Sequence, residues 1–268
     1  MQDPGWVNDE FGWELMRWQG IFRNLAHKGY KIAMVSRPGH EALYEDYIED
    51  YIGIEAPPGG ETDGWRINSK VQYLSKTLLD KYPGYKYMDP TTSMKIGIDP
   101  LGSGQKFITY GENCEIEAYN YILVHPRSTS KCETDIRNWS KENWKELCYK
   151  IRSLGLLVGV IGSQSGSLEL QESNDFRGIS LDKLICLMRN ARLVIGPSSG
   201  PMHLASLCGT PHLVWTDDKV WGSCGGTNRE RYETKWNPLS TRAVVLDNCN
   251  WQPTVDEVYN TIVRELNG

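Results

Sequence analysis

The segment 193–217, LVIGPSSGPMHLASLCGTPHLVWTD, constrains the fold of this chain more than any other. An apolar run breaks at Gly196 into a loop of Pro, Ser and Gly, and a compact helix is predicted over 202–208. Gly209-Thr210-Pro211 closes that helix, and a second apolar run follows at 212–215. This order predicts a βαβ unit. A loop of this kind that leads into a helix presents backbone N–H groups and the positive end of the helix dipole, which is a natural site for phosphate. A loop that merely turns the chain has the same local pattern.

The second half of the chain repeats the alternation of strand and helix. Short apolar runs end in Gly, Pro or Ser, and the helices between them begin at capping residues and show apolar positions three and four residues apart. Alternating strands and helices favour a parallel sheet, with ligands beyond the carboxyl ends of the strands. The predicted strands are 121–124, 156–161, 193–195, 212–215 and 243–246. The helices are predicted to begin at Ser140, at Ser180 and at the capping box Thr254/Glu257. The first of these helices should end at Gly155 and bury Trp144, Leu147, Cys148, Ile151 and Leu154.

The first half of the chain also alternates strands and helices, but its sequence patterns are weaker. Leu15, Trp18, Phe22 and Leu25 recur at helical spacing, and Gly29 follows as a stop. The pattern further predicts a strand over 32–35, helices over about 40–51 and 67–78, and an irregular connection over 83–115. Two domains are therefore expected, an N-terminal lobe over 1–115 and a C-terminal lobe over 116–268.

Composition excludes several classes of protein. The net charge is −5 with no dense Lys/Arg cluster, so no nucleic-acid partner is expected. No apolar run approaches the roughly 20 residues of a membrane span, and the N-terminus lacks the basic and apolar regions of a signal peptide. The seven cysteines are odd in number and form no C-x-x-C pair. These features predict a soluble, reduced, cytoplasmic protein without a structural zinc site.

Several segments together resemble one enzyme family. The run from Ser198 to Ala205, followed by Gly209-Thr210-Pro211, resembles the donor-site segment of heptosyltransferase-type glycosyltransferases, family nine. A strand ending in His125-Pro126, a helix start at Trp139-Ser140 and a strand ending in glycine occur in the same order in that family. The likeness covers about 121–266. It implies an α/β fold of two Rossmann-like lobes (GT-B), with parallel sheets flanked by helices and a reduced N-terminal lobe.

The resemblance also implies an activity. Such an enzyme moves a sugar from a nucleotide-sugar donor to a hydroxyl of a glycan, lipid-linked or other acceptor, by an inverting and metal-independent reaction. The nucleotide sugar is a substrate, so no cofactor is expected, and the absence of a D-x-D triplet agrees with a metal-free site. Two alternatives stay open: a sugar-nucleotide epimerase of the same fold, and a non-catalytic protein that binds a nucleotide or a sugar.

The donor site is expected in the C-terminal lobe. Hydroxyl and N–H groups of the loop before the 202–208 helix are suited to phosphate, and an arginine directly after a strand end is suited to neutralising it. A buried structural histidine, a solvated arginine and a simple turn are the competing interpretations. The candidate donor-binding residues are Arg127, Arg137, Ser163, Ser198, Ser199, Gly200, Met202 and His203.

The general base is expected in the N-terminal lobe. Residues 8–16 resemble the G-x-x-G-D-type loop that enters the family's first helix, and Asp9, Glu10 and Glu14 cluster there. Glu14 is the first candidate for the catalytic base and Glu10 the second, while carboxylates that merely favour a helix start are the alternative. One departure concerns the donor: the family usually carries Asp just before S-G-P-M-H, and this chain has Pro197-Ser198. The family's sugar specificity is therefore not expected to carry over.

Overall fold

The computed structural model divides the chain into two compact units, Met1–Ile108 and Thr109–Gly268. The sequence pattern placed this division after Glu115. Each unit is an α/β structure and is considered by itself below. The residues that the structure describes are 2–6, 11–54, 76–88, 104–115, 118, 120–128, 136–220 and 226–268.

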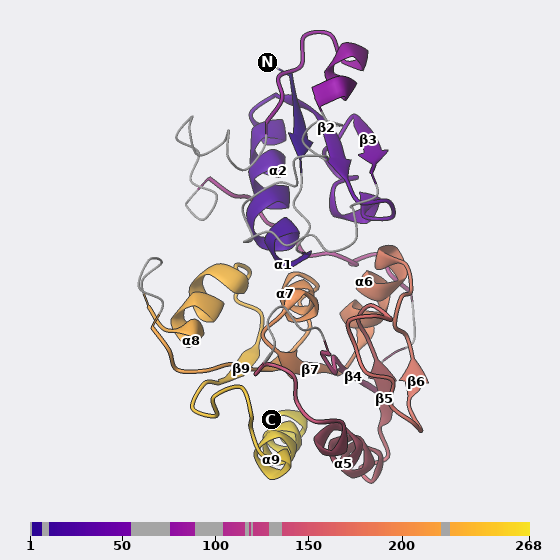
Figure 1. Cartoon of the computed structure of the whole chain (residues 1–268), viewed down its shortest axis with the longest axis vertical. Helices are drawn as coiled ribbons and strands as arrows, with labels where there is room; N and C mark the ends of the chain where they lie inside the picture. Colours follow the sequence, from indigo (N-terminus) through magenta and orange to yellow (C-terminus); the bar gives the residue numbers. More distant parts are fainter. Residues whose placement is uncertain are drawn as a thin grey trace. The chain divides into compact units, whose positions relative to one another are not determined.

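The second unit is built on a six-stranded parallel sheet with the order β6-β5-β4-β7-β8-β9 (Figure 1). From β4 the chain first adds strands on one side and then, with β7, on the other. In open parallel sheets this reversal marks the place where ligands bind. The strands are β4 (Tyr121–Val124), β5 (Leu157–Val160), β6 (Asn174–Asp175), β7 (Leu193–Pro197), β8 (His212–Trp215) and β9 (Ala243–Leu246).

Helices cover both faces of this sheet. In Figure 1, α5 and α9 lie side by side on one face, and α6 and α7 lie on the other. The helices are α5 (Lys141–Arg152), α6 (Leu181–Asn190), α7 (Gly200–Leu207), α8 (Asn228–Arg231), the π-helical turn η4 (Tyr232–Trp236) and α9 (Val255–Asn267).

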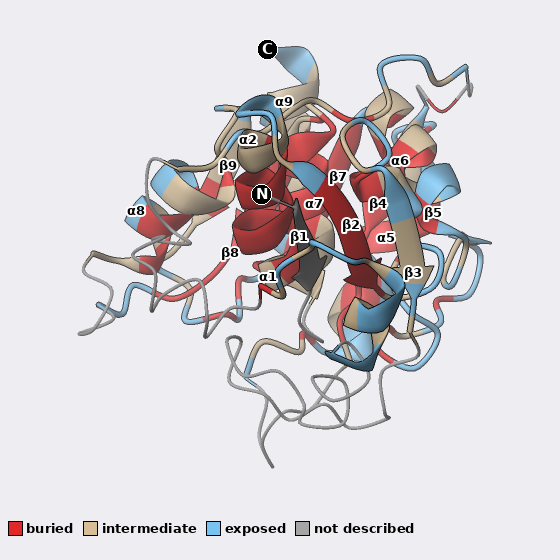
Figure 2. Ribbon diagram, turned by 90° about the horizontal axis from the view of Figure 1, so that it is seen from above, coloured by how far each residue is buried: buried red, intermediate tan, exposed pale blue. Residues whose placement is uncertain are grey.

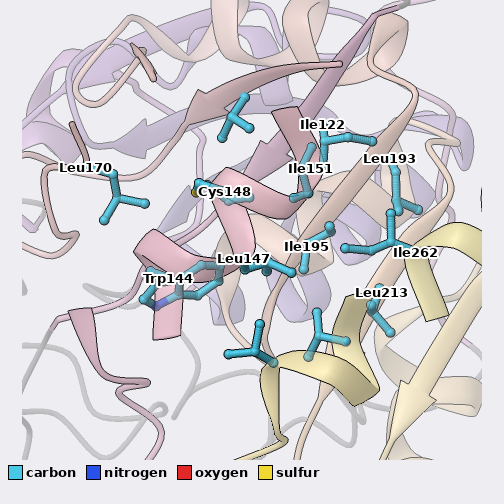
Figure 3. Packing of buried hydrophobic residues seen from close by; sticks show 14 of the residues in the cluster. Ile122, Trp144, Leu147, Cys148, Ile151, Leu170, Leu193, Ile195, Leu213 and Ile262 are labelled. Atoms are coloured by element: carbon cyan, nitrogen blue, oxygen red, sulfur yellow. The ribbon is translucent and has the colours of Figure 1, made fainter. Parts of the chain in front are cut away.

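The main core lies between the sheet and the pair α5 and α9 (Figure 3). Trp144, Leu147, Cys148 and Ile151 of α5 are buried, as the helical spacing predicted. Leu154, predicted on the same face, is exposed, because α5 ends at Arg152. Side chains from the strands and from α9 complete this layer, among them Ile122, Leu193, Ile195, Leu213 and Ile262.

Two of the three predicted helix caps make the expected bonds. Ser140 accepts a hydrogen bond from the N–H of Asn143, and Thr254 forms a full capping box with Glu257. Ser180 stands at the N-cap of α6, but its side chain makes no capping hydrogen bond to a backbone N–H.

The first unit contains a three-stranded parallel sheet of order β1-β2-β3. The predicted helix is present as one continuous run that includes a π-helical turn, and β2 is buried along most of its length (Figure 2). The elements are β1 (Gln2–Trp6), α1 (Phe11–Trp13), η1 (Glu14–Trp18), α2 (Gln19–His27), β2 (Lys31–Ser36), the 3-10 helix η2 (Glu41–Leu43), β3 (Asp50–Gly53) and the 3-10 helix η3 (Leu79–Lys81).

The helix predicted over 40–51 is wrong. The structure has only η2 and turns there, and 50–53 pairs with β2 as β3. Tyr44, Tyr47 and Tyr51 are spaced as they would be on one face of a helix. In the structure the ring of Tyr44 packs against both of the other rings without a helix. Of the helix predicted over 67–78, residues 67–75 lie outside the described residues, and 76–78 form a helical turn that leads into η3.

The expectation of fully reduced cysteines is also wrong. Cys114 and Cys186 form a disulfide that ties the segment before β4 to α6. Sequence spacing gave no sign of it, because the two residues are 72 positions apart. Cys148 and Cys208 are free and buried, and Cys148 lies on the helix face that was predicted to be buried. Cysteine usage therefore does not support the cytoplasmic expectation. Among the described residues, no helix has both the length and the apolar character that a bilayer crossing requires.

Candidate functional site

The carboxyl ends of β4, β5, β7 and β8 meet at one edge of the second unit's sheet, because these strands are parallel and adjacent. The segments that follow them begin at His125, Ile161, Ser198 and Thr216. Three of these four segments contain residues that the sequence proposed for the donor. The parallel topology thus gathers Arg127, Ser163 and the 198–203 segment at the same edge.

His125 links two of these segments directly. Its Nδ1 lies 3.0 Å from the hydroxyl oxygen of Ser199, which is the N-cap residue of α7. Burial, with the nearby charge of Arg127, lowers the pKa of His125 to about 3. The imidazole is therefore neutral at pH 7, and one of its nitrogens is free of a proton. The bond fixes the Ser199 side chain at the start of the helix.

The start of α7 has the backbone geometry expected of an anion site. Ser199 is extended, and its carbonyl accepts hydrogen bonds from the N–H groups of Met202 and His203. Pro201 follows in the first turn, where its missing N–H costs no helical bond. The positive end of the helix dipole and the amide of Gly200 thus lie at the carboxyl edge of the sheet, beside the Ser199 hydroxyl.

The neighbouring segment after β5 depends on a glycine. Gly162 has a φ of +120°, and a Cβ there would stand 2.0 Å from the Ser167 hydroxyl and 2.9 Å from the His125 ring. The Ser167 side chain is buried, and its hydroxyl has no hydrogen-bond partner among the described residues. Ser163 is exposed, and its hydroxyl accepts a bond from the N–H of Gly166. The segment is thus a compact turn closed against His125.

The two predicted arginines have different surroundings. Arg127 is buried, and its Nη1 donates to the Asn138 side chain at 2.6 Å. Arg137 lies over the ring of Trp251, with 5.9 Å from guanidinium carbon to ring centroid. The backbone of Arg127 bridges to Ser167 and so joins the segment after β4 to the segment after β5.

The structure places the side chains of Met202 and His203 away from solvent. Met202 is fully buried, and a Cβ on Gly196 would touch its sulfur. The His203 ring packs against Tyr232 and Trp236. Burial, followed by the nearby His212 and Arg231, lowers the pKa of His203 to about 3. A neutral His203 supplies no positive charge to a phosphate, although its backbone belongs to the first turn of α7.

The segment after β8 contributes a buried carboxylate that pattern reasoning left without a role. Asp217 accepts a hydrogen bond from the Asn228 side chain at the start of α8. Lys219 lies 3.7 Å from the same carboxylate. No group of three His, Cys, Asp or Glu side chains suited to a metal ion occurs in the ranges that the structure describes.

A second polar cluster lies in the first unit around Glu14. The Glu14 side chain is fully buried and contacts Ser36, His40 and Tyr44. Sequence reasoning found Glu14 but missed its three partners, which lie at and beyond the carboxyl end of β2. Glu10, the second candidate base, lies outside the described residues.

Comparison with known proteins identifies the family. The model of glycosyltransferase family 9 (heptosyltransferase) matches residues 101–258. This match spans more than half of the chain and includes the segments that follow β4, β5, β7 and β8. The chain belongs to glycosyltransferase family 9. It is therefore a glycosyltransferase, as the resemblance implied.

Solved structures agree on the fold of this family 9 chain. E. coli ADP-heptose lps heptosyltransferase II is 15% identical, with a TM-score of 0.62 over 100% of this chain and 98% of that one. E. coli heptosyltransferase WaaC with ADP is 13% identical, with a TM-score of 0.61 over 99% and 100%. These likenesses confirm the expected α/β fold of the GT-B class.

The same fold occurs in an epimerase. Methanocaldococcus jannaschii UDP-GlcNAc 2-epimerase is 12% identical, with a TM-score of 0.51 over 100% of this chain and 91% of that one. Fold alone therefore does not separate the two enzyme classes. Among curated proteins no match was found.

Proposed function

We propose that this family 9 protein transfers a sugar from a nucleoside-diphosphate sugar to a hydroxyl of a glycan, lipid-linked or other acceptor, with inversion and without a metal. The observation that supports this most is the start of α7. There the Ser199 hydroxyl, which lies 3.0 Å from His125, stands beside the amide of Gly200 within the residues that match the family model.

The site must stabilise the nucleoside diphosphate that leaves in the reaction. As the bond from the anomeric carbon to the phosphate oxygen breaks, its electron pair stays on the diphosphate, and negative charge develops there. The backbone amide of Gly200, the helix dipole and the Ser199 hydroxyl stabilise that charge. Arg127 adds a full positive charge at the end of β4. The exposed Ser163 hydroxyl is available to the ribose or the base.

Adenine is the first base to test, because WaaC was solved with ADP. The sugar is a separate question in this chain. Ser198 stands where the family usually carries Asp, so a contact that an acidic side chain makes to the donor is absent or made by another residue. We therefore propose a nucleotide-sugar donor without assigning its sugar.

A thermal-shift panel with ADP, GDP, UDP and CDP tests the donor site. A ligand that binds only the folded protein at 100 times its Kd stabilises it by about 2.7 kcal/mol. One nucleotide should raise the melting temperature, and Arg127→Met should weaken its affinity at least tenfold, since a hydrogen bond to a charged group contributes about 1.5–3 kcal/mol. Arg137→Met is the matched control and should change the affinity less. If none of the four nucleotides changed the melting temperature, the proposed donor site would be contradicted.

Turnover then separates the activities. The sugar nucleotide that corresponds to the stabilising base is incubated with the protein and followed by NMR. Transfer or hydrolysis with inverted anomeric configuration, unchanged by EDTA, supports the proposal. A new sugar epimer would identify an epimerase, loss of activity in EDTA would identify a metal-dependent enzyme, and binding without turnover would identify a binding protein.

A further inference from the structure

The Glu14 carboxylate is enclosed on both oxygens. Oε1 accepts hydrogen bonds from the Ser36 hydroxyl at 2.7 Å and from the Tyr44 hydroxyl at 2.6 Å, and Oε2 lies 2.8 Å from Nδ1 of His40. The exposed fraction of the Glu14 side chain is 0%. A carboxylate in this environment offers no surface to the hydroxyl of a substrate, so Glu14 does not take a proton from an acceptor directly.

The charge state of Glu14 follows from its neighbours. Burial by itself would raise its pKa. The charges of His40 and Arg37, with hydrogen bonds from His40 and Tyr44, outweigh burial and bring the pKa below the ordinary value. The group is ionised at neutral pH and acts only as an acceptor. The hydrogen in its contact with His40 therefore belongs to Nδ1 of the imidazole.

This assignment also fixes the tautomer that His40 has when the ring carries no charge. Such a ring keeps its hydrogen on Nδ1, beside the carboxylate, and has its free lone pair on Nε2. The His40 side chain is 18% exposed, whereas Glu14 is not exposed at all, and Phe11 packs edge-on against the ring at 5.6 Å between centroids. The ring is thus anchored through one nitrogen, and it is the only member of the pair that reaches the surface.

We infer that His40 is the proton acceptor of the transfer reaction and that Glu14 is its positioning residue; the inference rests on the function proposed above. Nε2 of His40 takes the proton of the acceptor hydroxyl, and the oxygen forms a bond to the anomeric carbon of the donor. The bond from that carbon to the diphosphate oxygen breaks, and the electron pair leaves with the nucleoside diphosphate. The proton then passes from Nε2 to solvent.

The arrangement follows the logic of an imidazole held by a buried carboxylate, in which the carboxylate sets the tautomer and stabilises the imidazolium that forms. The loop that carries His40 leaves the carboxyl end of β2, the usual side for ligands of a parallel sheet. The charged and titratable side chains that surround this cluster are Glu14, Arg37, Glu41, Tyr44 and Tyr51.

Nitrogen NMR of the imidazole tests the tautomer without any substrate. In protein labelled with ¹⁵N-histidine, the resonances of His40 are assigned by their loss in His40→Gln. At pH 8 they should show a protonated Nδ1 and an unprotonated Nε2. In Glu14→Gln, which keeps the side-chain volume and removes the charge, this preference should be lost. A wild-type ring with its hydrogen on Nε2 would overturn the inference.

Kinetics test the role of the pair. The donor is ADP-heptose first, or the sugar nucleotide of the base selected by thermal shift, with water as the acceptor hydroxyl. His40→Gln should lower kcat by about 10²- to 10⁴-fold, the range for loss of a general base, and change the dependence of kcat on pH. Glu14→Gln should lower kcat and also change this dependence, with KM for the donor changed little. His27→Gln, at an exposed histidine, is the control and should match wild type.

The experiments distinguish a failure of the role of His40 from a failure of the proposed glycosyltransferase function. Unchanged kcat and pH profile in His40→Gln, with an active wild type, would overturn the role of His40 and leave the glycosyltransferase intact. A wild type that binds nucleotide but turns over no donor would overturn both. Folding of the variants is checked by circular dichroism and thermal unfolding, which should match wild type, and nucleotide affinity should be equal in wild type and in both variants.

Discussion

Reduction of the disulfide between Cys114 and Cys186 should lower the stability of the second unit substantially. The bond closes a loop of 72 positions. The loop-closure relation gives an entropy of roughly 15 cal/mol/K for this length, which amounts to about 4 kcal/mol at 25 °C. Most of this effect acts through the unfolded chain, because the linked segment stays docked by other contacts. Tyr110 N–H bonds the carbonyl of Leu207, and the Asn190 side chain bonds the carbonyl of Cys114.

Urea unfolding with and without a reductant measures this contribution. The oxidised wild type should be more stable than the reduced protein by up to about 4 kcal/mol. The double variant Cys114→Ser/Cys186→Ser should resemble the reduced wild type and should not respond further to the reductant, which separates this bond from effects on other cysteines. Equal unfolding free energies in both conditions, or peptide mapping that finds both residues as thiols, would refute the reasoning.

Two further predictions concern the second unit, one for its buried histidines and one for Gly162. Burial first lowers the pKa of His125 and His203 to about 3 and that of His212 to about 4, so below pH 6.5 the unfolded chain binds protons that the folded chain does not. Their contribution to the free energy of unfolding is complete above pH 6.5 and is lost as pH falls, by roughly 2 kcal/mol per histidine at pH 5. Urea unfolding at pH 7.5 and 5.0 measures this loss. An unfolding free energy that does not depend on pH would contradict it. Gly162→Ala should destabilise the protein by more than about 1 kcal/mol and weaken nucleotide binding, since it adds a Cβ at positive φ against Ser167 and His125. Gly155→Ala is the control, because Gly155 also has positive φ but nothing lies within 4 Å of its Cβ; equal losses in the two variants would rule out the contact.

Five of the six strands of the second unit were predictable because each is a short apolar run that ends at residues unable to continue it. The edge strand β6 (Asn174–Asp175) is polar and was not predicted. The boundaries at 121–124, 212–215 and 243–246 are confirmed residue for residue. The central strands β7 and β8 are buried along their whole length, so their hydrophobicity carries the signal without help from distant parts of the chain.

The first unit was less predictable because its elements depend on tertiary pairing. β1 contains Pro4 and Gly5, which local propensity disfavours in a strand, and it forms by pairing with β2. The partners of Glu14 could not be read from the sequence for the same reason. His40 and Tyr44 lie 26 and 30 positions beyond it and reach it only when β2 and η2 are folded. The pattern identified the carboxylate, and only the structure identified what the carboxylate holds.

The neutral state of the donor-side histidines has a consequence for ligand binding. If His125 acts only by holding the Ser199 hydroxyl, removing it should weaken ADP binding by the same factor at every pH between 6.5 and 8.5, because its pKa of about 3 leaves it uncharged throughout. The ratio of Kd values between His125→Gln and wild type isolates this effect, since titration of the phosphate itself affects both proteins equally. A hydrogen bond between neutral groups contributes about 1 kcal/mol, so the ratio should be roughly five. A ratio that grows as pH falls towards 6.5 would mean that His125 becomes an imidazolium when nucleotide binds, and the charge at the diphosphate would then come from this ring in addition to Arg127 and the helix.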